Sequence, residues 1–587
     1  MPRIAVIDRN LCKSKKCGHL CAKVCPLNRA GKECVKVNEF PEINESLCIG
    51  CGLCVKSCEK AGFGAISIVN LPEELKENPI HRFGPNQFVL YRLPFPIKNE
   101  IVGIIGSNGL GKTTALKILS GELKPNLGVL DGVAEPEQLI KIFRGTELQN
   151  YLEMLIEKKI KTSVKPQRVD QIPFLYREKV SKLLEKVDER KILNELISLL
   201  NLQSVMDSKI DEISGGELQR VAIAACLAKD ADFFFFDEPT SFLDVFQRLN
   251  VAKIIRKYCE NRAVMVVDHD LATLDFLADR IHIFYGCPGV YGIVSKPYSV
   301  RAGINTFLDG FIKEDNVRIR QEPITFFTSL AEQSISPEIA VFFENIKKKF
   351  EKFQLEIRSG DIRKKEVLAV LGANALGKTT FAKILAGEIK ADYGIIKNKV
   401  KISYKPQYVQ TDFKGTVRQL LSTVADVEND EYKSEIIRPL GLEKLLEKNV
   451  QELSGGELQR VAIALTLSRD ANLYLLDEPS AFLDVEQRIA IGKMINKIAE
   501  IKEKSVLVID HDLLFLSQIG RRAMLFLGIP GKSGYAEIDT LKNSFNKFLK
   551  EIGITFRKDP QTGRPRANKP NSKIDREQKE SGEFFYV

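Results

Sequence analysis

Short apolar runs, separated by polar and glycine-rich segments, recur along the chain. Four of them predict buried parallel strands, because each is followed directly by a glycine-rich or acidic loop. These runs are Ile101–Ile105, Phe233–Phe236, Val367–Leu371 and Leu473–Leu476. No apolar run reaches the roughly 18 residues of a membrane span. The pattern predicts an α/β protein built on parallel sheets.

The motifs around these strands occur twice, in the same order. The repeated stretches are Gly106–Thr113 and Gly372–Thr379, Ser214–Arg220 and Ser454–Arg460, Phe236–Pro239 and Leu476–Pro479, and Asp268–Asp270 and Asp510–Asp512. Such self-similarity indicates two copies of one domain. The glycine-rich stretches are 266 positions apart whereas the serine-led ones are 240 apart, so the first copy holds 26 additional residues.

The additional residues fall near 135–161 and predict a helical insertion in the first copy. The apolar positions at helical spacing are Leu148, Tyr151, Leu152 and Leu155, and the basic residues that follow are Lys158, Lys159 and Lys161. Helical spacing gives the segment an apolar face that packs on its own domain. The charge pattern alone leaves two interpretations open, a packed surface elaboration and a binding element.

Each copy begins its chemistry with a strand, a glycine-rich turn and a helix, the context of a phosphate-binding loop. Backbone N–H groups and the helix N-terminus attract phosphates, and the lysine reaches the terminal phosphoryl group. The residues expected to bind ATP here are Gly106, Asn108, Gly109, Gly111, Lys112, Thr113 and Thr114, and Gly372, Asn374, Gly377, Lys378, Thr379 and Thr380. The second loop has Ala375 in place of Gly109, which a negative φ would tolerate.

Two acidic residues follow a buried strand in each copy. The aspartate at the strand end suits Mg²⁺, and the next glutamate is placed to orient the water that attacks in phosphoryl transfer. The expected magnesium ligands are Thr113, Gln167, Asp237, Thr379, Gln407 and Asp477. The expected catalytic residues are Glu238, His269, Glu478 and His511.

The order of these motifs resembles that of ABC-type ATPases. In that family two nucleotide-binding domains face each other head to tail, and ATP lies between the phosphate loop of one and the signature of the other. The resemblance implies that Ser454 and Gly456 complete the first site, and that Ser214 and Gly216 complete the second. It also implies an aromatic ring that stacks on adenine, for which the candidates are Phe83, Phe88, Phe350 and Phe353.

Composition adds a metal-binding head to this picture. The 587 residues are 44% hydrophobic and 28% charged, which excludes a disordered chain, and the net charge of +10 favours a polyanionic partner. Nine of the 12 cysteines lie between Cys12 and Cys58. Because the polar start does not read as a secretory signal, we expect a cytoplasmic protein whose cysteines bind metal.

The cysteine spacing is that of a ferredoxin with two clusters, in which the fourth cysteine of each run crosses to the other cluster. One expected [4Fe–4S] cluster has the ligands Cys12, Cys17, Cys21 and Cys58, and the other has Cys25, Cys48, Cys51 and Cys54. Cys34 falls outside both runs and is interpreted as an ordinary thiol. The alternative is a pair of zinc sites with four cysteines each.

The ferredoxin-like head, the twin ABC domains and the insertion together resemble the E subfamily of ABC proteins, the RNase L inhibitor or ribosome-recycling factor family. Further matches are Ser299–Asn305 and Ile552–Arg566, which resemble the hinge segments of that family. The expected organisation is an α+β ferredoxin-like domain at 1–75, nucleotide-binding domains at 76–298 and 331–530 in head-to-tail arrangement, a hinge at 299–330 and a C-terminal hinge segment at 531–587.

The resemblance implies a monomeric, ATP-driven factor that splits ribosomes into subunits after termination or stalling and stays on the small subunit. Its implied cofactors are ATP, Mg²⁺ and two [4Fe–4S] clusters. Its implied partners are the small subunit with its rRNA, a class-1 release factor or its rescue paralogue, and initiation factors, with no membrane.

Two other functions compete with this one. A twin ATPase that serves a membrane transporter leaves the cysteine-rich head unexplained. An iron–sulfur electron carrier fused to an ATPase is the other, and no flavin motif in the sequence supports it. A DNA-repair ATPase of the coiled-coil type is excluded, because no long heptads separate the motifs.

Overall fold

The computed structural model describes residues 3–71, 77–130, 135–326, 336–398, 400–407 and 412–585. The chain forms two compact units. Unit 1 comprises Met1–Pro239 and Val251–Ile324, and unit 2 comprises Thr240–Asn250 and Thr325–Val587. The expected boundaries at 75/76 and 330/331 lie outside the described residues. Within the described ranges, no helix is long and apolar enough to span a membrane.

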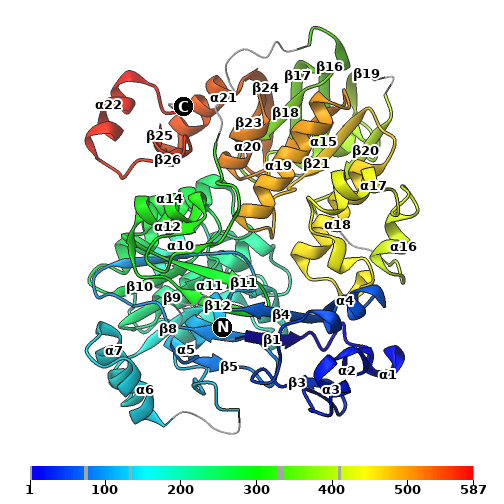
Figure 1. The fold of residues 1–587 in the computed structure, drawn as a ribbon. Helices are drawn as coiled ribbons and strands as arrows, with labels where there is room; N and C mark the ends of the chain where they lie inside the picture. Colours follow the sequence, from blue (N-terminus) through cyan, green and yellow to red (C-terminus); the bar gives the residue numbers. More distant parts are fainter. Residues whose placement is uncertain are drawn as a thin grey trace. The chain divides into compact units, whose positions relative to one another are not determined.

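Unit 1 begins with a small α+β head. Strand β1 (Arg3–Ile7) pairs antiparallel with β4 (Ile66–Asn70), and β2 (Val35–Val37) pairs with β3 (Pro41–Ile43). The helices are α1 (Ser14–Cys17), α2 (Leu20–Val24), α3 (Pro26–Arg29) and α4 (Leu53–Lys60), drawn in blue in Figure 1. Helix α2 packs against α4, so the two cysteine runs lie side by side.

The first ABC copy is built on one mixed sheet. Its strands are β5 (His81–Arg82), β6 (Val89–Tyr91), β7 (Ile101–Ile105), β8 (Thr162–Lys165), β9 (Phe233–Asp237), β10 (Ala263–Val267), β11 (Arg280–Cys287), β12 (Tyr291–Val294) and β13 (Tyr298–Ser299). The order is β5-β6-β12-β11-β7-β10-β9-β8, with β13 beside β11. The five strands from β11 to β8 are parallel, which confirms the predicted fold class.

The second copy repeats this sheet in unit 2. Its strands are β16 (Ile339–Lys349), β17 (Gln354–Arg363), β18 (Val367–Leu371), β19 (Tyr393–Asn398), β20 (Ile402–Lys405), β21 (Leu473–Asp477), β22 (Ser505–Ile509), β23 (Arg522–Ile529) and β24 (Ser533–Thr540). The order is β19-β16-β17-β24-β23-β18-β22-β21-β20. Here β23, β18, β22, β21 and β20 are the parallel strands, in the same order as their counterparts.

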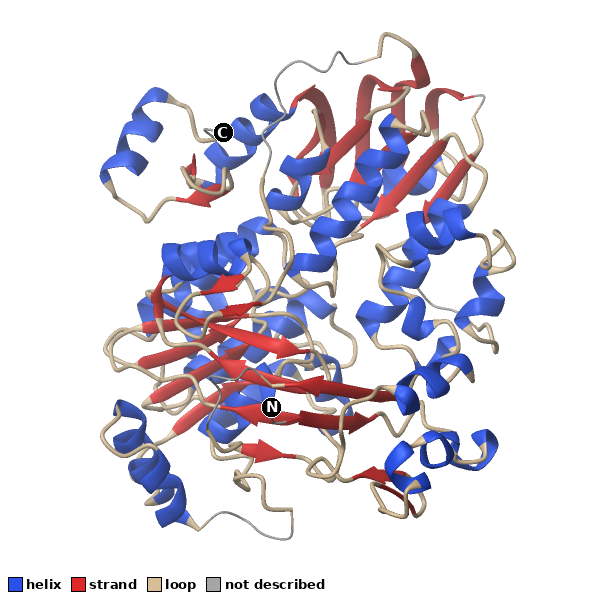
Figure 2. Cartoon of the chain, viewed as in Figure 1, coloured by secondary structure: helices blue, strands red, loops and turns tan. Residues whose placement is uncertain are grey.

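Helices surround these sheets, as Figure 2 shows in blue. Those of unit 1 that bear on function are α5 (Lys112–Leu119), α11 (Gly215–Ala228), α13 (Leu271–Leu277) and α14 (Val300–Asp309). Those of unit 2 are α15 (Lys378–Leu385), α18 (Gly455–Ser468), α19 (Val485–Glu500), α20 (Leu513–Ile519), α21 (Leu541–Ile552) and α22 (Lys573–Ser581). Strands β25 (Phe556–Lys558) and β26 (Pro565–Ala567) pair antiparallel near the C-terminus.

The segment 135–161 forms two helices, α6 (Pro136–Ile142) and α7 (Glu147–Ile156). The α7 side chains of Leu148, Tyr151 and Leu152 are buried in the core of the first copy, and the Tyr151 hydroxyl donates to the Leu119 carbonyl. The three lysines at 158, 159 and 161 are exposed. The segment thus has a packed apolar face and a solvated basic end.

Nucleotide sites and cysteine pockets

The phosphate loops connect β7 to α5 and β18 to α15. In each, the lysine at the helix start is buried and curls back onto the loop. Lys112 Nζ donates to the Gly106 and Ser107 carbonyls at 2.7 and 2.9 Å, and Lys378 Nζ donates to Gly372 and Ala373 at 2.7 Å each. The other predicted loop residues, among them Asn108, Thr114, Asn374 and Thr380, lie in the same turns and first helical turns. The ammonium groups are therefore placed where a bound phosphate would meet them.

Asp237 ends β9 beside the phosphate loop. Its Oδ2 accepts a 2.7 Å hydrogen bond from Thr113 Oγ1, whereas its Oδ1 is buried and accepts none. Burial raises the pKa of Asp237 to about 6, and the neighbouring Glu238 carboxylate adds to this rise. Burial raises the pKa of Asp477 to about 6 as well. A buried carboxylate oxygen that accepts no hydrogen bond, next to a threonine hydroxyl, is a suitable ligand for a hard divalent cation.

Glu238 and Glu478 follow these aspartates, and a glutamine and a histidine approach each of them. Gln167 Nε2 donates to Glu238 Oε1 at 2.5 Å, and Gln407 Nε2 donates to Glu478 Oε1 at 2.8 Å. The histidine Nε2 atoms of His269 and His511 lie 3.7 and 3.3 Å from the same oxygens. Although burial opposes ionisation, His511 lowers the pKa of Glu478. The structure thus brings together the predicted glutamate, histidine and glutamine in both copies.

The signature residues begin helices α11 and α18. Both helices start at the first glycine of the motif, because the serine side chain caps the helix. Ser214 Oγ accepts from Glu217 N, and Glu217 Oε2 accepts from Ser214 N at 2.8 Å. Ser454 and Glu457 form the same capping box. Gly216 and Gly456 therefore lie in the first helical turn, where N–H groups are free of intrahelical partners.

The structure separates the aromatic candidates for adenine stacking. Phe88 and Phe353 pack against the cores, and their rings lie against the glycine before the lysine, at 2.8 and 3.0 Å from where a Cβ of Gly111 or Gly377 would be. Phe83 is 52% exposed and Phe350 is 39% exposed. Phe83 and Phe350 are therefore the more exposed ring of each pair.

Ala375 has a positive φ, so the negative φ that would tolerate an alanine in this loop is not present. Its φ is +60°, in the left-handed region, and Gly109 at the equivalent place has φ +79°. The reason is a shared backbone contact, since Gly531 N donates to Ala375 O and Gly289 N donates to Gly109 O, each at 2.9 Å. The second loop therefore carries backbone strain that the first one avoids.

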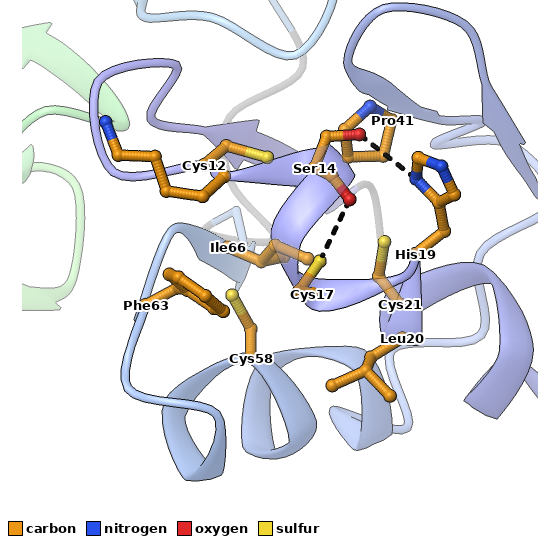
Figure 3. A pocket seen from close by; sticks show the side chains of 11 residues that line it. Cys12, Ser14, Cys17, His19, Leu20, Cys21, Pro41, Cys58, Phe63 and Ile66 are labelled. Carbon is orange, nitrogen blue, oxygen red and sulfur yellow. Dashed lines mark hydrogen bonds between the residues drawn. The ribbon is translucent and has the colours of Figure 1, made fainter.

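The cysteines of the head line two apolar pockets. Four sulfurs surround the first pocket, those of Cys12, Cys17, Cys21 and Cys58, as Figure 3 shows. Cys58 reaches this pocket from α4 because α4 packs beside α2, which carries Cys21. Burial raises the pKa of the Cys21 thiol to about 11, so a metal that binds there must displace the thiol proton.

The second pocket gathers five cysteines, Cys25, Cys34, Cys48, Cys51 and Cys54. The interpretation of Cys34 as a thiol outside both runs is therefore incomplete, since its side chain is buried in the same pocket. The cause is the hairpin β2–β3, which brings Cys34 N to Asn28 Oδ1 at 2.9 Å and Asn44 N to the Cys34 carbonyl at 2.8 Å. Its Sγ donates to the Asn44 carbonyl at 3.9 Å.

The head is attached to the strand pair that precedes the first phosphate loop. Asn86, which is buried between β5 and β6, accepts from Ile43 N at 2.7 Å and donates to the Ala5 and Ile43 carbonyls. Arg82 forms two hydrogen bonds to Glu45, at 2.6 and 3.0 Å. The loop that carries Phe83 and Phe88 is thus fastened to both head sheets.

Sequence reasoning missed two pairs of buried polar residues beside the glutamates. Lys165 and Lys405 end β8 and β20, and Gln219 and Gln459 lie on the signature helices. All four are buried and donate to backbone carbonyls at the ends of β9 and β21. The signal in the sequence is the repeated Lys-Pro-Gln, because a lysine at the end of an apolar strand is unusual.

Comparison with known proteins agrees with this architecture. Residues 97–241 and 355–481 match the ABC transporter family, residues 2–33 match a possible Fer4-like domain in RNase L inhibitor, and residues 40–66 match a 4Fe-4S binding domain. The chain therefore carries ABC ATPase domains and an iron–sulfur domain.

Relatives match over the whole length. An uncharacterized ABC transporter ATP-binding protein of Methanocaldococcus jannaschii is 51% identical over 100% of this chain and 98% of its own. Translation initiation factor RLI1 of Saccharomyces cerevisiae is 43% identical over 100% of this chain and 98% of its own. A chain in the structure of ribosome-bound archaeal Pelota and ABCE1 has a TM-score of 0.94 and 49% identity. The match covers 100% of this chain and 99% of that one. The protein belongs to the E family of ABC proteins, the RLI/ABCE1-type ATPases with an iron–sulfur head.

Proposed function

We propose that this protein is a ribosome recycling factor, which uses ATP to split ribosomes into subunits after termination or stalling and then stays on the small subunit. The observation that carries the proposal is the likeness, over the full length of both chains, to the archaeal ABCE1 described with ribosome-bound Pelota. The proposed partners are the small subunit with its rRNA, a class-1 release factor or its rescue paralogue, and initiation factors. The protein acts as a cytoplasmic monomer.

Two ATP sites drive the cycle in this proposal. Lys112 and Lys378 leave their loop carbonyls for the phosphates, and Phe83 and Phe350 stack on adenine. The signature serine of each copy, Ser214 or Ser454, completes the site of the other copy. This arrangement makes closure of the two copies depend on bound ATP, and hydrolysis reverses it.

The residues around Glu238 and Glu478 fit the hydrolytic step. Each glutamate accepts from a glutamine that holds its carboxylate, and a histidine lies beside it to contact the terminal phosphate. Mg²⁺ would be held through Asp237 with Thr113 and Gln167, and through Asp477 with Thr379 and Gln407. When bound, the ion neutralises charge on the transferring phosphoryl group.

Two [4Fe–4S] clusters complete the proposed cofactors. The first pocket supplies Cys12, Cys17, Cys21 and Cys58, and the second supplies Cys25, Cys48, Cys51 and Cys54. The four cysteines of the first pocket, and the five of the second from which Cys34 is set aside, support this count. The match to a 4Fe-4S binding domain supports iron over zinc.

Sedimentation of ribosomes tests the proposal. Purified archaeal ribosomes, this protein, ATP and a termination or rescue factor are expected to yield free subunits, with the protein in the small-subunit fraction. The reaction without ATP is the control. Intact ribosomes after complete ATP turnover would contradict the proposal, and co-purification of the protein with membranes would favour a transporter ATPase instead.

A further inference from the structure

A lysine is buried at the same place in both copies. Lys165 is the last residue of β8 and Lys405 is the last residue of β20, and both side chains are 0% exposed. Burial of an ammonium group is costly unless hydrogen bonds replace its hydration. A buried lysine repeated in two copies therefore calls for a specific set of acceptors.

The acceptors are backbone carbonyls at the strand end that carries the acidic pair. Lys165 Nζ donates to the carbonyls of Asp237 and Glu238 at 2.9 and 3.0 Å. Lys405 Nζ donates to the carbonyls of Asp477 and Pro406 at 2.7 and 3.1 Å. All four acceptors are backbone carbonyls, so each lysine holds the backbone that carries the catalytic carboxylate.

That backbone has an unusual conformation. Glu238 has φ +48° and Glu478 has φ +49°, in the left-handed region that a residue with a Cβ occupies at a cost of about 1 kcal/mol. One further hydrogen bond in each copy stabilises this backbone conformation. Gln219 Nε2 donates to the Glu238 carbonyl at 2.7 Å, and Gln459 Nε2 donates to the Glu478 carbonyl at 2.6 Å.

The conformation determines where the glutamate side chain points. With φ positive, the side chain leaves the strand direction and turns toward the glutamine and histidine that approach it. A relaxed backbone would move the carboxylate, and a displacement of about 1 Å at a reacting group costs about 100-fold in rate. The lysine thus bears on the rate of hydrolysis without a phosphate contact of its own.

We infer that Lys165 and Lys405 are positioning residues for ATP hydrolysis, which hold the peptide of the catalytic glutamate in its left-handed conformation. The inference rests on the proposed catalytic role of Glu238 and Glu478. An equivalent lysine has this role in each copy, although its second acceptor is the Glu238 carbonyl in the first copy and the Pro406 carbonyl in the second. In the first copy, Gln219 and Lys165 both donate to the Glu238 carbonyl. In the second copy, Gln459 donates to the Glu478 carbonyl and the lysine does not.

The test is the double variant Lys165→Met, Lys405→Met in the full-length protein with its iron–sulfur clusters. We expect kcat for ATP to fall about 10- to 100-fold, because the glutamate is displaced. The Kd for a fluorescent ATP analogue is expected to stay within about threefold, since the phosphate loops are untouched. Lys401→Met is the matched control, because this lysine lies four positions earlier, is exposed and pairs with Asp470; its kcat is expected to equal that of the parent.

Lys165→Gln with Lys405→Gln keeps an amide NH₂ as a donor group and is expected to recover part of kcat. An unchanged kcat in the methionine variant, or a Kd that weakens as much as kcat falls, would overturn the inference. Loss of the thermal transition in both double variants would show the lysines to be structural and would overturn it too. The double variant Glu238→Gln, Glu478→Gln is measured beside them, so that a failure of the catalytic assignment is recognised separately.

Discussion

Gln167 Nε2 donates a 2.5 Å hydrogen bond to Glu238 Oε1, and the equivalent bond from Gln407 to Glu478 is 2.8 Å long. The glutamine follows the last strand of the parallel sheet and the glutamate follows the next one, so the bond joins two neighbouring strand ends. It holds the carboxylate within reach of the histidine in both copies.

Substitution of these carboxylates tests their role as water-activating groups. Glu238→Gln and Glu478→Gln keep the shape of the side chain but cannot take a proton from water. We expect each change to lower ATP hydrolysis, and the double change to lower it about 100-fold or more, while ATP binding is retained. The double variant is expected to remain closed on ATP and bound to the small ribosomal subunit. Phosphate release and co-sedimentation measure the two effects; Glu185→Gln, at an exposed position, is the control, and normal turnover in the double variant would refute the assignment.

The crossed cysteine arrangement predicts which cluster a single substitution affects. Cys58→Ser is expected to reduce iron from about eight to about four per chain, because it removes one ligand of the pocket formed with Cys12, Cys17 and Cys21. Cys34→Ser is the matched comparison and is expected to keep the full iron content, since the second pocket retains its four proposed ligands. ATP hydrolysis without ribosomes is expected to survive both changes. Zinc in place of iron, or equal iron loss in both variants, contradicts the ligand sets.

The basic end of the insertion predicts a contact with rRNA. Replacement of Lys158, Lys159 and Lys161 by alanine is expected to weaken binding to the small subunit. The slope of log affinity against log salt should fall by up to about one unit per lost phosphate contact. The buried face of α7 is unchanged, so basal ATP hydrolysis should equal that of the parent. Lys182→Ala, on an exposed part of the first copy, is the control. Unchanged affinity and slope would leave the insertion with a packing role only.

The left-handed conformation of Ala375 predicts opposite effects of two reciprocal changes. Ala375→Gly is expected to stabilise the second copy by up to about 1 kcal/mol, because glycine adopts this φ without steric cost. Gly109→Ala is expected to destabilise the first copy by more than that, since a Cβ there would lie 3.1 Å from Gly289 N. Thermal unfolding of each variant measures the effects. A lower midpoint for Ala375→Gly would show that the alanine is not strained.

Local sequence patterns were enough to predict the twin ABC organisation, the iron–sulfur head and the residues of the phosphate loops. These features follow from local chemistry, because an apolar strand, a glycine-rich turn and a capped helix are specified by neighbours in the chain. The ends of β9 and β21, and the start of β7 and β18, fell within one residue of the predicted runs for that reason.

Several other contacts between distant residues became apparent only in the folded chain. The β2–β3 hairpin brings Cys34 into the second pocket, where the cysteine spacing did not place it. The parallel pairing of β8 with β9 brings Lys165 to the carbonyl of Glu238. The φ of Ala375 depends on its bond to Gly531, which lies more than 150 positions away. Contacts of this kind depend on long-range pairing and register, which short-range residue patterns do not encode.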